Sequence, residues 1–242
     1  MFANKVVLVT GGSSGVGAAT AELFAKEGAS VAIVGRREDR LKEVAEHCEK
    51  YGAKTLIIKA DVSKAEETKS IVQKTIDKFG KLDVLVNNTG ILRYTTIQDP
   101  NLIGNFDEVT KTNLRSVVIV TSLAIPHLIA TKGNIVNVSS ICSTPDNIAY
   151  RTSKAAMNHF TRSLALELAP HGIRVNSISP GPVLTDIFEG LEVNEEMLKK
   201  NTALQRISEA SEIANMIVYV ASDKAKGITG SNFVIDNGTL LK

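Results

Sequence analysis

Short apolar runs alternate with longer segments of mixed polarity along the whole chain. Seven runs of apolar, mostly β-branched residues are spaced through it: Val6–Val9, Val31–Val34, Leu56–Ile58, Leu82–Val86, Ile135–Val138, Val175–Ile178 and Phe233–Ile235. Runs this short and this continuously apolar are typical of strands that helices cover on both faces. The pattern therefore predicts seven buried strands.

Segments with helical spacing of their apolar residues lie between these runs. They span Gly15–Lys26, Arg37–Lys50, Ala65–Lys78, Asn105–Ala130, Ala149–Ala169 and Glu209–Ala221. Five glycines each follow a predicted helix, where a left-handed backbone favours glycine: Gly28, Gly52, Gly80, Gly133 and Gly172. Strand, helix and strand in repeated order predict parallel pairing through right-handed crossovers. We therefore expect an α/β fold, a single domain over residues 1–242 with a doubly wound, seven-stranded parallel sheet of Rossmann type and helices on both faces.

Composition narrows the class of protein. The most apolar segment, 116–130, is interrupted at Ser122 and Pro126 among others, so no membrane span is expected. A net charge of +2, with basic residues beside acidic ones, gives no reason to expect a nucleic-acid partner. Cys48 and Cys142 are too few for a disulfide framework, and no histidine lies at metal-ligand spacing from them. We expect a cytoplasmic protein without a metal ion.

The turn after the first strand is rich in glycine and reads Thr10-Gly11-Gly12-Ser13-Ser14-Gly15-Val16-Gly17. Glycine lets the backbone approach a pyrophosphate, and the next helix offers free N–H groups and the positive end of its dipole. The spacing G-x-x-x-G-x-G differs from the common G-x-G-x-x-G, and an ordinary strand-to-helix turn is the alternative. Its place after the first strand favours a dinucleotide site. The candidate cofactor-binding residues are Gly11, Ser13, Ser14, Gly15, Val16 and Gly17.

The end of the second strand indicates which dinucleotide binds. A carboxylate there would bind the ribose 2′-hydroxyl of NAD(H), whereas arginine accommodates the 2′-phosphate of NADP(H). Here Arg36 and Arg37 come first and the first carboxylate is Glu38. NADP(H) is favoured and NAD(H) stays possible, with a solvated basic helix start as the alternative.

Two further strand ends lie at the same edge of the predicted sheet. Asp61 and Val62, after the third strand, could contact the adenine, although Asp61 could equally cap the next helix. Asn88 and Gly90 follow the fourth strand in the same crevice.

Tyr150 is the only tyrosine with a lysine, Lys154, four residues later. Positions i and i+4 share one face of a helix, and a nearby cation would lower the phenol pKa from its usual value of about 10. Upstream, Ser139 and Ser140 end the fifth strand, where a hydroxyl can hold a substrate oxygen. Asn113 interrupts an apolar helix and could bind a water. A surface helix, a strand-end serine and a helix-bending asparagine are the alternatives.

Together and in order, these pieces resemble the short-chain dehydrogenase/reductase family over essentially the whole chain, and 3-oxoacyl-carrier-protein reductases within it. The matching motifs are Thr10-Gly11-x-x-x-Gly15-x-Gly17, Asp61-Val62, Asn87-Asn88-Thr89-Gly90, Asn113, Ser139-Ser140, Tyr150-x-x-x-Lys154, Pro180-Gly181-Pro182-Val183-Leu184-Thr185, Ile228-Thr229-Gly230 and Asp236-Asn237-Gly238. The resemblance implies an NAD(P)-dependent oxidoreductase acting on CH–OH groups.

The resemblance also implies roles for single residues. It implies a catalytic tetrad of Asn113, Ser140, Tyr150 and Lys154, the last two also contacting the cofactor. Arg36, helped by Arg37, would bind the 2′-phosphate. The residues implied to line the nicotinamide are Pro180, Gly181, Val183 and Thr185. Because family members are commonly tetramers that pair the 105–130 and 149–169 helices between subunits, a homotetramer is expected.

Three departures from the family pattern bear on function. Thr89 stands where alanine is usual, Ser14 stands where some NADP(H) members carry a basic residue, and Tyr150 follows Ser140 by fewer residues than usual. Thr89 and the short spacing from Ser140 to Tyr150 leave open a catalytically idle NAD(P)-binding sensor or scaffold, although all four tetrad residues are present. An NAD-preferring alcohol dehydrogenase is a further alternative.

The expected substrate is fairly apolar, of the steroid, terpenoid, acyl or quinone class. Segments 91–96, 141–149 and 186–205 are expected to surround it, the last as a polar, irregularly patterned helical insertion. Their apolar residues are Ile141, Ile148, Ile187, Phe188, Leu191, Met197 and Leu198. We expect the insertion to close over bound cofactor and exclude water. Carbonyl reduction is the expected direction, since cells keep NADP(H) largely reduced.

Overall fold

The predicted strands form one parallel sheet in the computed structural model, which describes residues 1–142, 147–190 and 192–242. The strands are β1 Val6–Thr10, β2 Ser30–Gly35, β3 Thr55–Lys59, β4 Val84–Asn87, β5 Asn134–Val138, β6 Arg174–Pro180 and β7 Asn232–Ile235. Their spatial order is β3-β2-β1-β4-β5-β6-β7. The predicted seven-stranded, doubly wound sheet in a single domain is confirmed.

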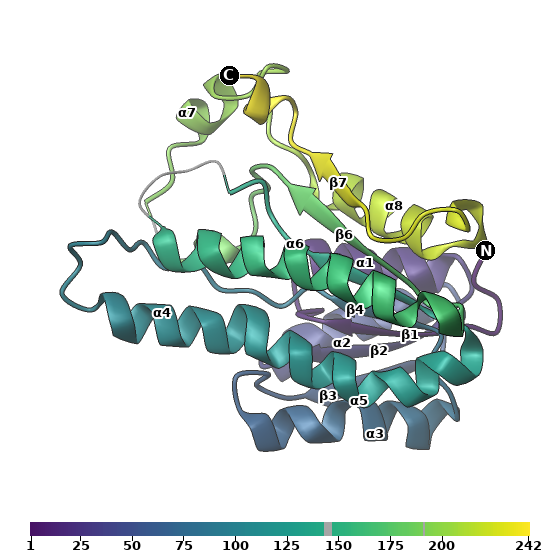
Figure 1. Ribbon diagram of the computed structural model, residues 1–242. Helices are drawn as coiled ribbons and strands as arrows, with labels where there is room; N and C mark the ends of the chain where they lie inside the picture. The colour runs from purple at the N-terminus through teal and green to yellow at the C-terminus, as the bar shows by residue number, and fades with distance from the viewer. Residues whose placement is uncertain (143–146, 191) are drawn as a thin grey trace.

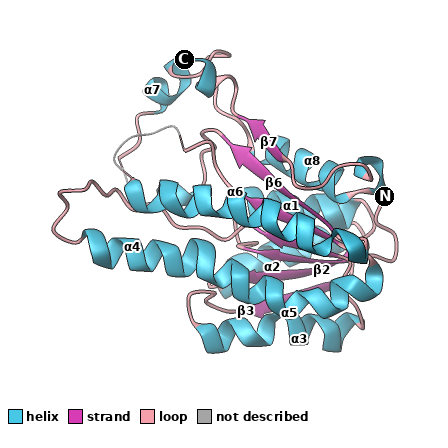
Figure 2. Cartoon of the chain, in the orientation of Figure 1, coloured by secondary structure: helices cyan, strands magenta, loops and turns pink. Residues whose placement is uncertain are grey.

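Helices cover both faces of this sheet (Figures 1 and 2). On one face lie α1 Gly15–Lys26, α2 Glu38–Glu49 and α8 Ala210–Ala221, and on the other lie α3 Ala65–Phe79, α5 Ser116–Thr131 and α6 Ile148–Leu168. The helix α4 Leu102–Thr110 continues through a π-helical turn, η1 Lys111–Arg115, into α5. The short helices are η2 Ala169–His171, η3 Asp186–Phe188, α7 Glu195–Lys200, η4 Asp223–Ala225 and η5 Thr239–Leu241.

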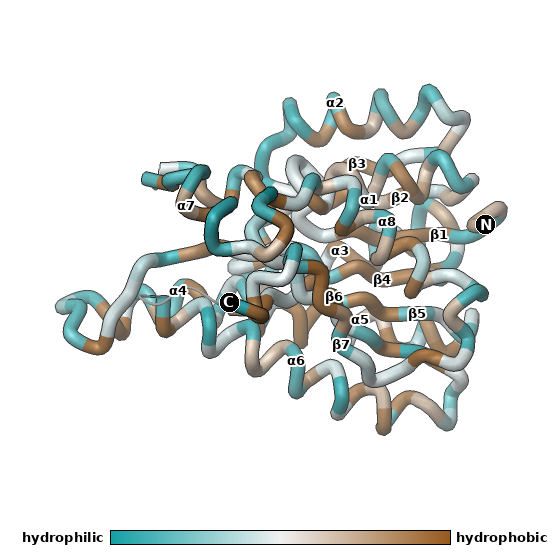
Figure 3. The backbone as a smooth tube through the Cα atoms, turned by 90° about the horizontal axis from the view of Figure 1, so that it is seen from above, coloured by the Kyte–Doolittle hydropathy of each residue, from teal (hydrophilic) through white to brown (hydrophobic). Residues whose placement is uncertain are grey.

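Side-chain alternation along the strands builds two apolar cores. In β1, Val7 and Val9 pack with Phe24 of α1, whereas Leu8 packs with Leu128 of α5 on the opposite face. Each such burial contributes about 1.5 to 3 kcal/mol. In Figure 3 the apolar colour accordingly follows the strands between the helical layers. The continuous apolar runs of the sequence are thus explained by burial on both faces.

The edge strands depart from this expectation of full burial. In β3 only Ile58 is fully buried, and in β7 no residue is. Each of these strands has a neighbour on one side only, so helices and strands cover less of it.

Two local expectations are wrong. Gly133 does not take the left-handed conformation; the preceding residue, Lys132, does, with φ 51°. Gly133 is instead required by space, because a Cβ there would lie 2.5 Å from the carbonyl oxygen of Asp83. Pro126 also does not interrupt its segment but lies inside α5.

Because Pro126 is accommodated, residues Leu102–Thr131 form one helix of 30 residues that is long and apolar enough to cross a membrane by those two criteria. A core helix of a folded domain meets the same criteria. Here Val117, Val120, Ala124 and Leu128 are buried, so one face of the helix packs against the sheet.

The strand order indicates where a ligand-binding crevice lies. β1 lies between β2 and β4, and the chain order reverses between β1 and β4. In doubly wound sheets ligands bind beyond the carboxyl ends of the strands at such a switch point. The insertion with η3 and α7, and the C-terminal turn η5, lie at this end of the molecule (Figure 1).

Candidate active site

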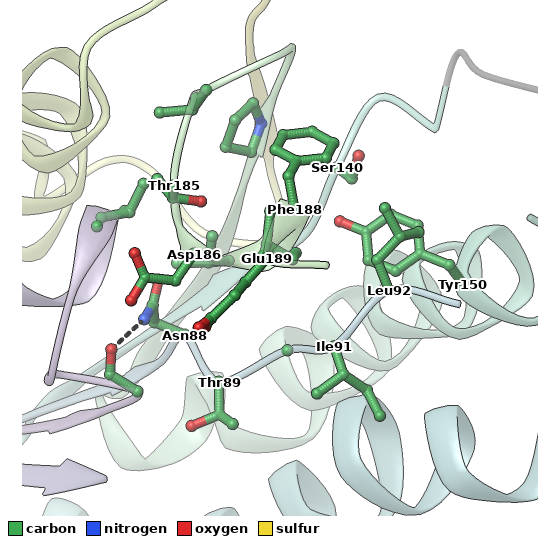
Figure 4. A pocket seen from close by; sticks show the side chains of 18 of the residues that line it. Asn88, Thr89, Ile91, Leu92, Ser140, Tyr150, Thr185, Asp186, Phe188 and Glu189 are labelled. Atoms are coloured by element: carbon green, nitrogen blue, oxygen red, sulfur yellow. Dashed lines mark hydrogen bonds between the residues drawn. The ribbon is translucent and has the colours of Figure 1, made fainter. Parts of the chain in front are cut away.

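A cavity of about 1070 Å³ lies at the carboxyl ends of the strands. The predicted site residues that line it are Gly11, Ser13, Ser14, Gly15, Val16, Arg36, Arg37, Asp61, Val62, Asn88, Gly90, Ser140, Tyr150, Lys154, Pro180, Gly181, Val183 and Thr185. Gly17 and Asn113 are not among its lining residues. The structure therefore brings all of the predicted cofactor residues but Gly17, and three of the four tetrad residues, to one hollow (Figure 4).

Gly17 is held behind the turn rather than in its wall. A Cβ at Gly17 would lie 2.1 Å from the carbonyl oxygen of Gly11 and 2.5 Å from Nδ2 of Asn88. Nδ2 of Asn88 in turn donates to the carbonyls of Thr10 and Gly11, at 3.1 Å each. The end of β4 thus fixes the shape of the glycine turn, and the close packing excludes a side chain at position 17.

The start of α1 is free to receive an anion. Ser14 stands at the N-cap position without a side-chain cap hydrogen bond, and the first turn carries no acidic residue. Gly15 has φ +52°, and a Cβ there would lie 2.7 Å from Cγ2 of Thr185. Free N–H groups at a helix N-terminus bind phosphates. The residues present fit a dinucleotide pyrophosphate.

The two arginines after β2 differ in their surroundings. Arg36 is exposed at the rim of the cavity. Arg37 donates from Nη2 to Oγ of Ser14 at 2.9 Å and to the carboxylate of Asp186 at 2.5 Å. The pair with Asp186 could not be predicted from spacing, since 149 positions separate the two residues.

At the end of β3, Asp61 lines the cavity and shapes its own loop. Its carboxylate accepts from the N–H of Ser63 at 2.9 Å, and Lys64 occupies the N-cap position of α3. Asp61 therefore closes a turn before the helix rather than capping it.

Tyr150, Lys154 and Ser140 meet at the centre of the cavity. Nζ of Lys154 lies 5.7 Å from the ring centre of Tyr150 and donates to the carbonyl of Val138 at 2.8 Å. The side chains of Ser140 and Tyr150 reach the same hollow, as Figure 4 shows, and Ser140 is one of the groups that shift the pKa of Tyr150. Oγ of Ser139 instead donates to the carbonyl of Lys154 at 3.1 Å and is buried. Of the two serines, Ser140 is the one that faces Tyr150.

The pKa values of this pair differ from the sequence-based expectation. Burial raises the pKa of Tyr150 to about 12, although the Ser140 hydrogen bond lowers it. Burial also lowers the pKa of Lys154 to about 8. The expectation that the lysine lowers the tyrosine pKa is wrong for this structure, because removal from water disfavours phenolate and ammonium alike.

Asn113 lies behind the cavity in the π-helical turn η1. Its Oδ1 accepts from the N–H of Ile91 at 2.9 Å, and its Nδ2 donates to the carbonyl of Ile91 at 3.0 Å. A Cβ added at Gly90 would lie 3.5 Å from Nζ of Lys154 and 3.7 Å from Oδ1 of Asn113. The glycine therefore leaves open the space where lysine and asparagine converge.

Thr89 adds a hydroxyl group on the cofactor side of the cavity. Its Oγ1 is buried and has no hydrogen-bond partner among the described residues. Its backbone N–H donates to Oγ1 of Thr10 at 3.3 Å, so the main chain is held by β1 even though the hydroxyl is not.

The substrate side of the cavity is partly apolar. Of the apolar residues expected there, those that line it are Ile141, Ile187, Phe188, Met197 and Leu198. Ile148 does not line it, and Leu191 and positions 143–146 of the loop lie outside the described residues. Arg93, in the expected segment 91–96, also lines the cavity. Sequence reasoning missed Glu108, which lines it too and forms a bidentate ion pair with Arg93 at 2.6 and 2.9 Å.

Over the described ranges of the chain, no three side chains of histidine, cysteine, aspartate or glutamate gather closely enough to hold a metal ion. Cys48 and Cys142 carry free thiols.

Comparison with known sequences finds one matching family over nearly the whole chain. A family model described as enoyl-(acyl carrier protein) reductase matches residues 11–239. A Thermotoga maritima protein named as an uncharacterized oxidoreductase is 38% identical, with 98% of each chain covered. A 3-oxoacyl-[acyl-carrier-protein] reductase of Staphylococcus aureus is 36% identical, with 100% of each covered.

Solved structures of similar proteins were crystallised with either nicotinamide dinucleotide. A short-chain dehydrogenase from Burkholderia cenocepacia in complex with NADP matches with a TM-score of 0.92 and 33% identity, covering 99% of each chain. A 3-ketoacyl-(acyl-carrier-protein) reductase from Brucella melitensis complexed with NADH matches with a TM-score of 0.92 and 30% identity, again over 99% of each chain.

Proposed function

Since the chain belongs to the short-chain dehydrogenase/reductase family and is an NAD(P)-dependent oxidoreductase of carbonyl or alcohol groups, we propose that it uses NADP(H) to reduce a fairly apolar small-molecule ketone. The proposal rests above all on one observation. Tyr150, Ser140 and Lys154 line the same cavity as the glycine turn at the start of α1. A hydride donor seated on that turn and a proton donor at Tyr150 would face one substrate.

The residues of the site would have different roles in the reaction. When bound, the nicotinamide supplies or accepts the hydride. Ser140 holds the substrate oxygen, where charge develops in the transition state. The hydroxyl of Tyr150 donates a proton to that oxygen, and its high pKa keeps it protonated at neutral pH, as a general acid requires. Lys154 places a cation beside the ring, and Asn113 with Gly90 leaves room for a water that relays the next proton.

The insertion, segment 186–205, supports a proposal on the class of substrate and on how the site closes. Ile187, Phe188 and Met197 give its inner side an apolar surface and favour a steroid, terpenoid, acyl or quinone carbonyl. We expect the segment 186–205 to close over the bound cofactor and exclude water from the hydride step.

We also propose a homotetramer, because Val118 and Leu166 expose 41% and 81% of their area on the two helical segments that such assemblies pair. The free thiols of Cys48 and Cys142 fit a reducing, cytoplasmic location.

Arg36→Ala tests the choice of cofactor. Removing one charge-assisted contact to the 2′-phosphate should weaken NADPH binding about 10- to 100-fold and leave NADH binding within about twofold. Fluorescence titration with each nucleotide measures both affinities. Arg40→Ala is the matched control, since Arg40 is exposed on α2 and pairs with Glu43. Equal or tighter NADH binding by the wild-type protein would favour an NAD-preferring alcohol dehydrogenase instead.

The pH profile tests the role of Lys154. Its pKa of about 8 means that the cation is present below pH 8 and is lost as the pH rises through that value. We expect kcat/KM for carbonyl reduction to be level near pH 7 and to fall about tenfold per pH unit above about 8. In Lys154→Arg the fall should move to higher pH, because guanidinium stays charged. A wild-type profile that stays flat to pH 9.5 would rule out this role.

A further inference from the structure

A cluster of charged side chains joins the end of β2 to the insertion at the outer rim of the cavity. Nη2 of Arg37 donates to Oδ2 of Asp186 at 2.5 Å and to Oγ of Ser14 at 2.9 Å. Nη1 of the same guanidinium lies 3.8 Å from a carboxylate oxygen of Glu189. Both terminal nitrogens of Arg37 are thus directed to groups of the protein itself.

The position of Asp186 is fixed by its neighbours. Thr185, the residue before it, packs against Gly15 at the start of α1. The 3₁₀ turn η3 then begins at Asp186. In Figure 4 the carboxylates of Asp186 and Glu189 point toward Asn88, on the cofactor side of the cavity.

The charges at this rim nearly cancel. Arg36 and Arg37 contribute two positive charges, and Asp186 and Glu189 contribute two negative ones. The hydrogen bond from Arg37 lowers the pKa of Asp186, so this carboxylate is ionised at neutral pH. Asp61 lies on the same side, and despite its burial the Ser63 hydrogen bonds and the charge of Arg36 lower its pKa.

The two cofactors would meet this cluster differently. A phosphate monoester carries about −1.5 to −2 charges at neutral pH and needs hydrogen-bond donors. Any hydrogen bond from Arg37 to the 2′-phosphate of NADP(H) would have to compete with Asp186 for the guanidinium, whereas the 2′-hydroxyl of NAD(H) makes no such demand.

We propose that Asp186 is a specificity-determining residue: by occupying Arg37, it limits how strongly the site prefers NADP(H) over NAD(H). The inference rests on the proposed function, because it assumes that the cavity binds a nicotinamide dinucleotide. In this proposal Arg36 is the main ligand of the 2′-phosphate, and Arg37 can bind it only by leaving Asp186.

The test is a double-variant titration. Dissociation constants for NADPH and NADH are measured by fluorescence for the wild-type protein, Asp186→Asn, Arg37→Ala and the combined variant. Exposed ion pairs contribute little, so Asp186→Asn should tighten NADPH binding about three- to fivefold. NADH binding should change less than twofold. Glu196→Gln, an exposed carboxylate of the same insertion that pairs with Lys199, is the matched control.

The combined variant shows whether Asp186 acts through Arg37. If Asp186 acts by binding Arg37, adding Asp186→Asn to the Arg37→Ala variant should raise NADPH affinity less than twofold. An unchanged NADPH-to-NADH ratio in Asp186→Asn, weaker NADPH binding, or a gain that persists in full without Arg37 would each overturn the proposal. A wild-type protein that binds neither nucleotide would instead overturn the proposed function, and this inference with it.

Discussion

Tyr150→Phe is expected to lower kcat/KM for carbonyl reduction about 10²- to 10⁴-fold, the usual worth of a positioned proton donor. The substitution removes one hydroxyl and keeps the ring beside Nζ of Lys154. The ribose and nicotinamide contacts of the site should therefore survive, and NADPH affinity should change less than about threefold. Steady-state kinetics with a reducible ketone and a fluorescence titration with NADPH measure the two quantities separately.

Tyr219→Phe is the matched control, because Tyr219 lies on α8 with 42% of its area exposed. It should retain wild-type turnover. If Tyr150→Phe kept more than a tenth of the wild-type kcat/KM, a different group would have to deliver the proton, and the assignment of Tyr150 would be lost.

Gly17→Ala is expected to have the second large effect, on cofactor binding. The added Cβ would lie 2.1 Å from the carbonyl oxygen of Gly11, so the glycine turn must move. Movement of a binding loop by about 1 Å can cost 10²-fold, and we expect a loss of about that size in NADPH affinity. Overpacking of about 1 to 3 kcal/mol should also lower the melting temperature by roughly 5 °C.

The control for this variant is Gly227→Ala. Gly227 has no positive φ, and a Cβ there would meet nothing within 4 Å. Its affinity and melting temperature should match the wild type. A folded Gly17→Ala protein that binds NADPH within threefold of wild type would contradict the view that this turn receives the pyrophosphate.

Most of the fold could be predicted from the sequence, because buried strands and helix faces leave a regular pattern of apolar residues along the chain. All seven strands lie where apolar runs occur, and each predicted helix begins and ends within a few residues of the observed one. The errors arise where tertiary contacts override local preference. Lys132 takes the left-handed conformation, Gly133 packs against the carbonyl of Asp83 instead, and α5 continues past Pro126.

The residues of the candidate site were predictable for a different reason. Strand order places the carboxyl ends of β1, β4 and β5 at one edge of the sheet, so motifs at those ends converge. Contacts between distant segments left no such signal. The Arg37–Asp186 pair and the reciprocal hydrogen bonds between Asn113 and Ile91 depend on how loops pack, which spacing along the chain does not encode.

The electrostatics of Tyr150 show a further limit of spacing arguments. A lysine four residues away indicates proximity, but it does not say how much water either group retains. With Lys154 buried and Tyr150 half-buried in the cavity wall, the pKa of Tyr150 rises to about 12 and that of Lys154 falls to about 8. Tyrosine is thereby favoured as the proton donor of a reduction, and lysine becomes the group that sets the alkaline limit.

A labelled cofactor shows whether the hydride of the nicotinamide reaches a carbonyl carbon with Tyr150 as proton donor. The wild-type protein is incubated with NADPH carrying deuterium at C4 in either configuration and with steroid, terpenoid and 3-oxoacyl thioester ketones, and the products are examined by mass spectrometry. We expect one of the two labelled forms to place deuterium on the carbinol carbon, and Tyr150→Phe to form almost none of this alcohol in the same time. Absence of labelled alcohol from every ketone, with both NADPH and NADH bound by the protein, would contradict this expectation.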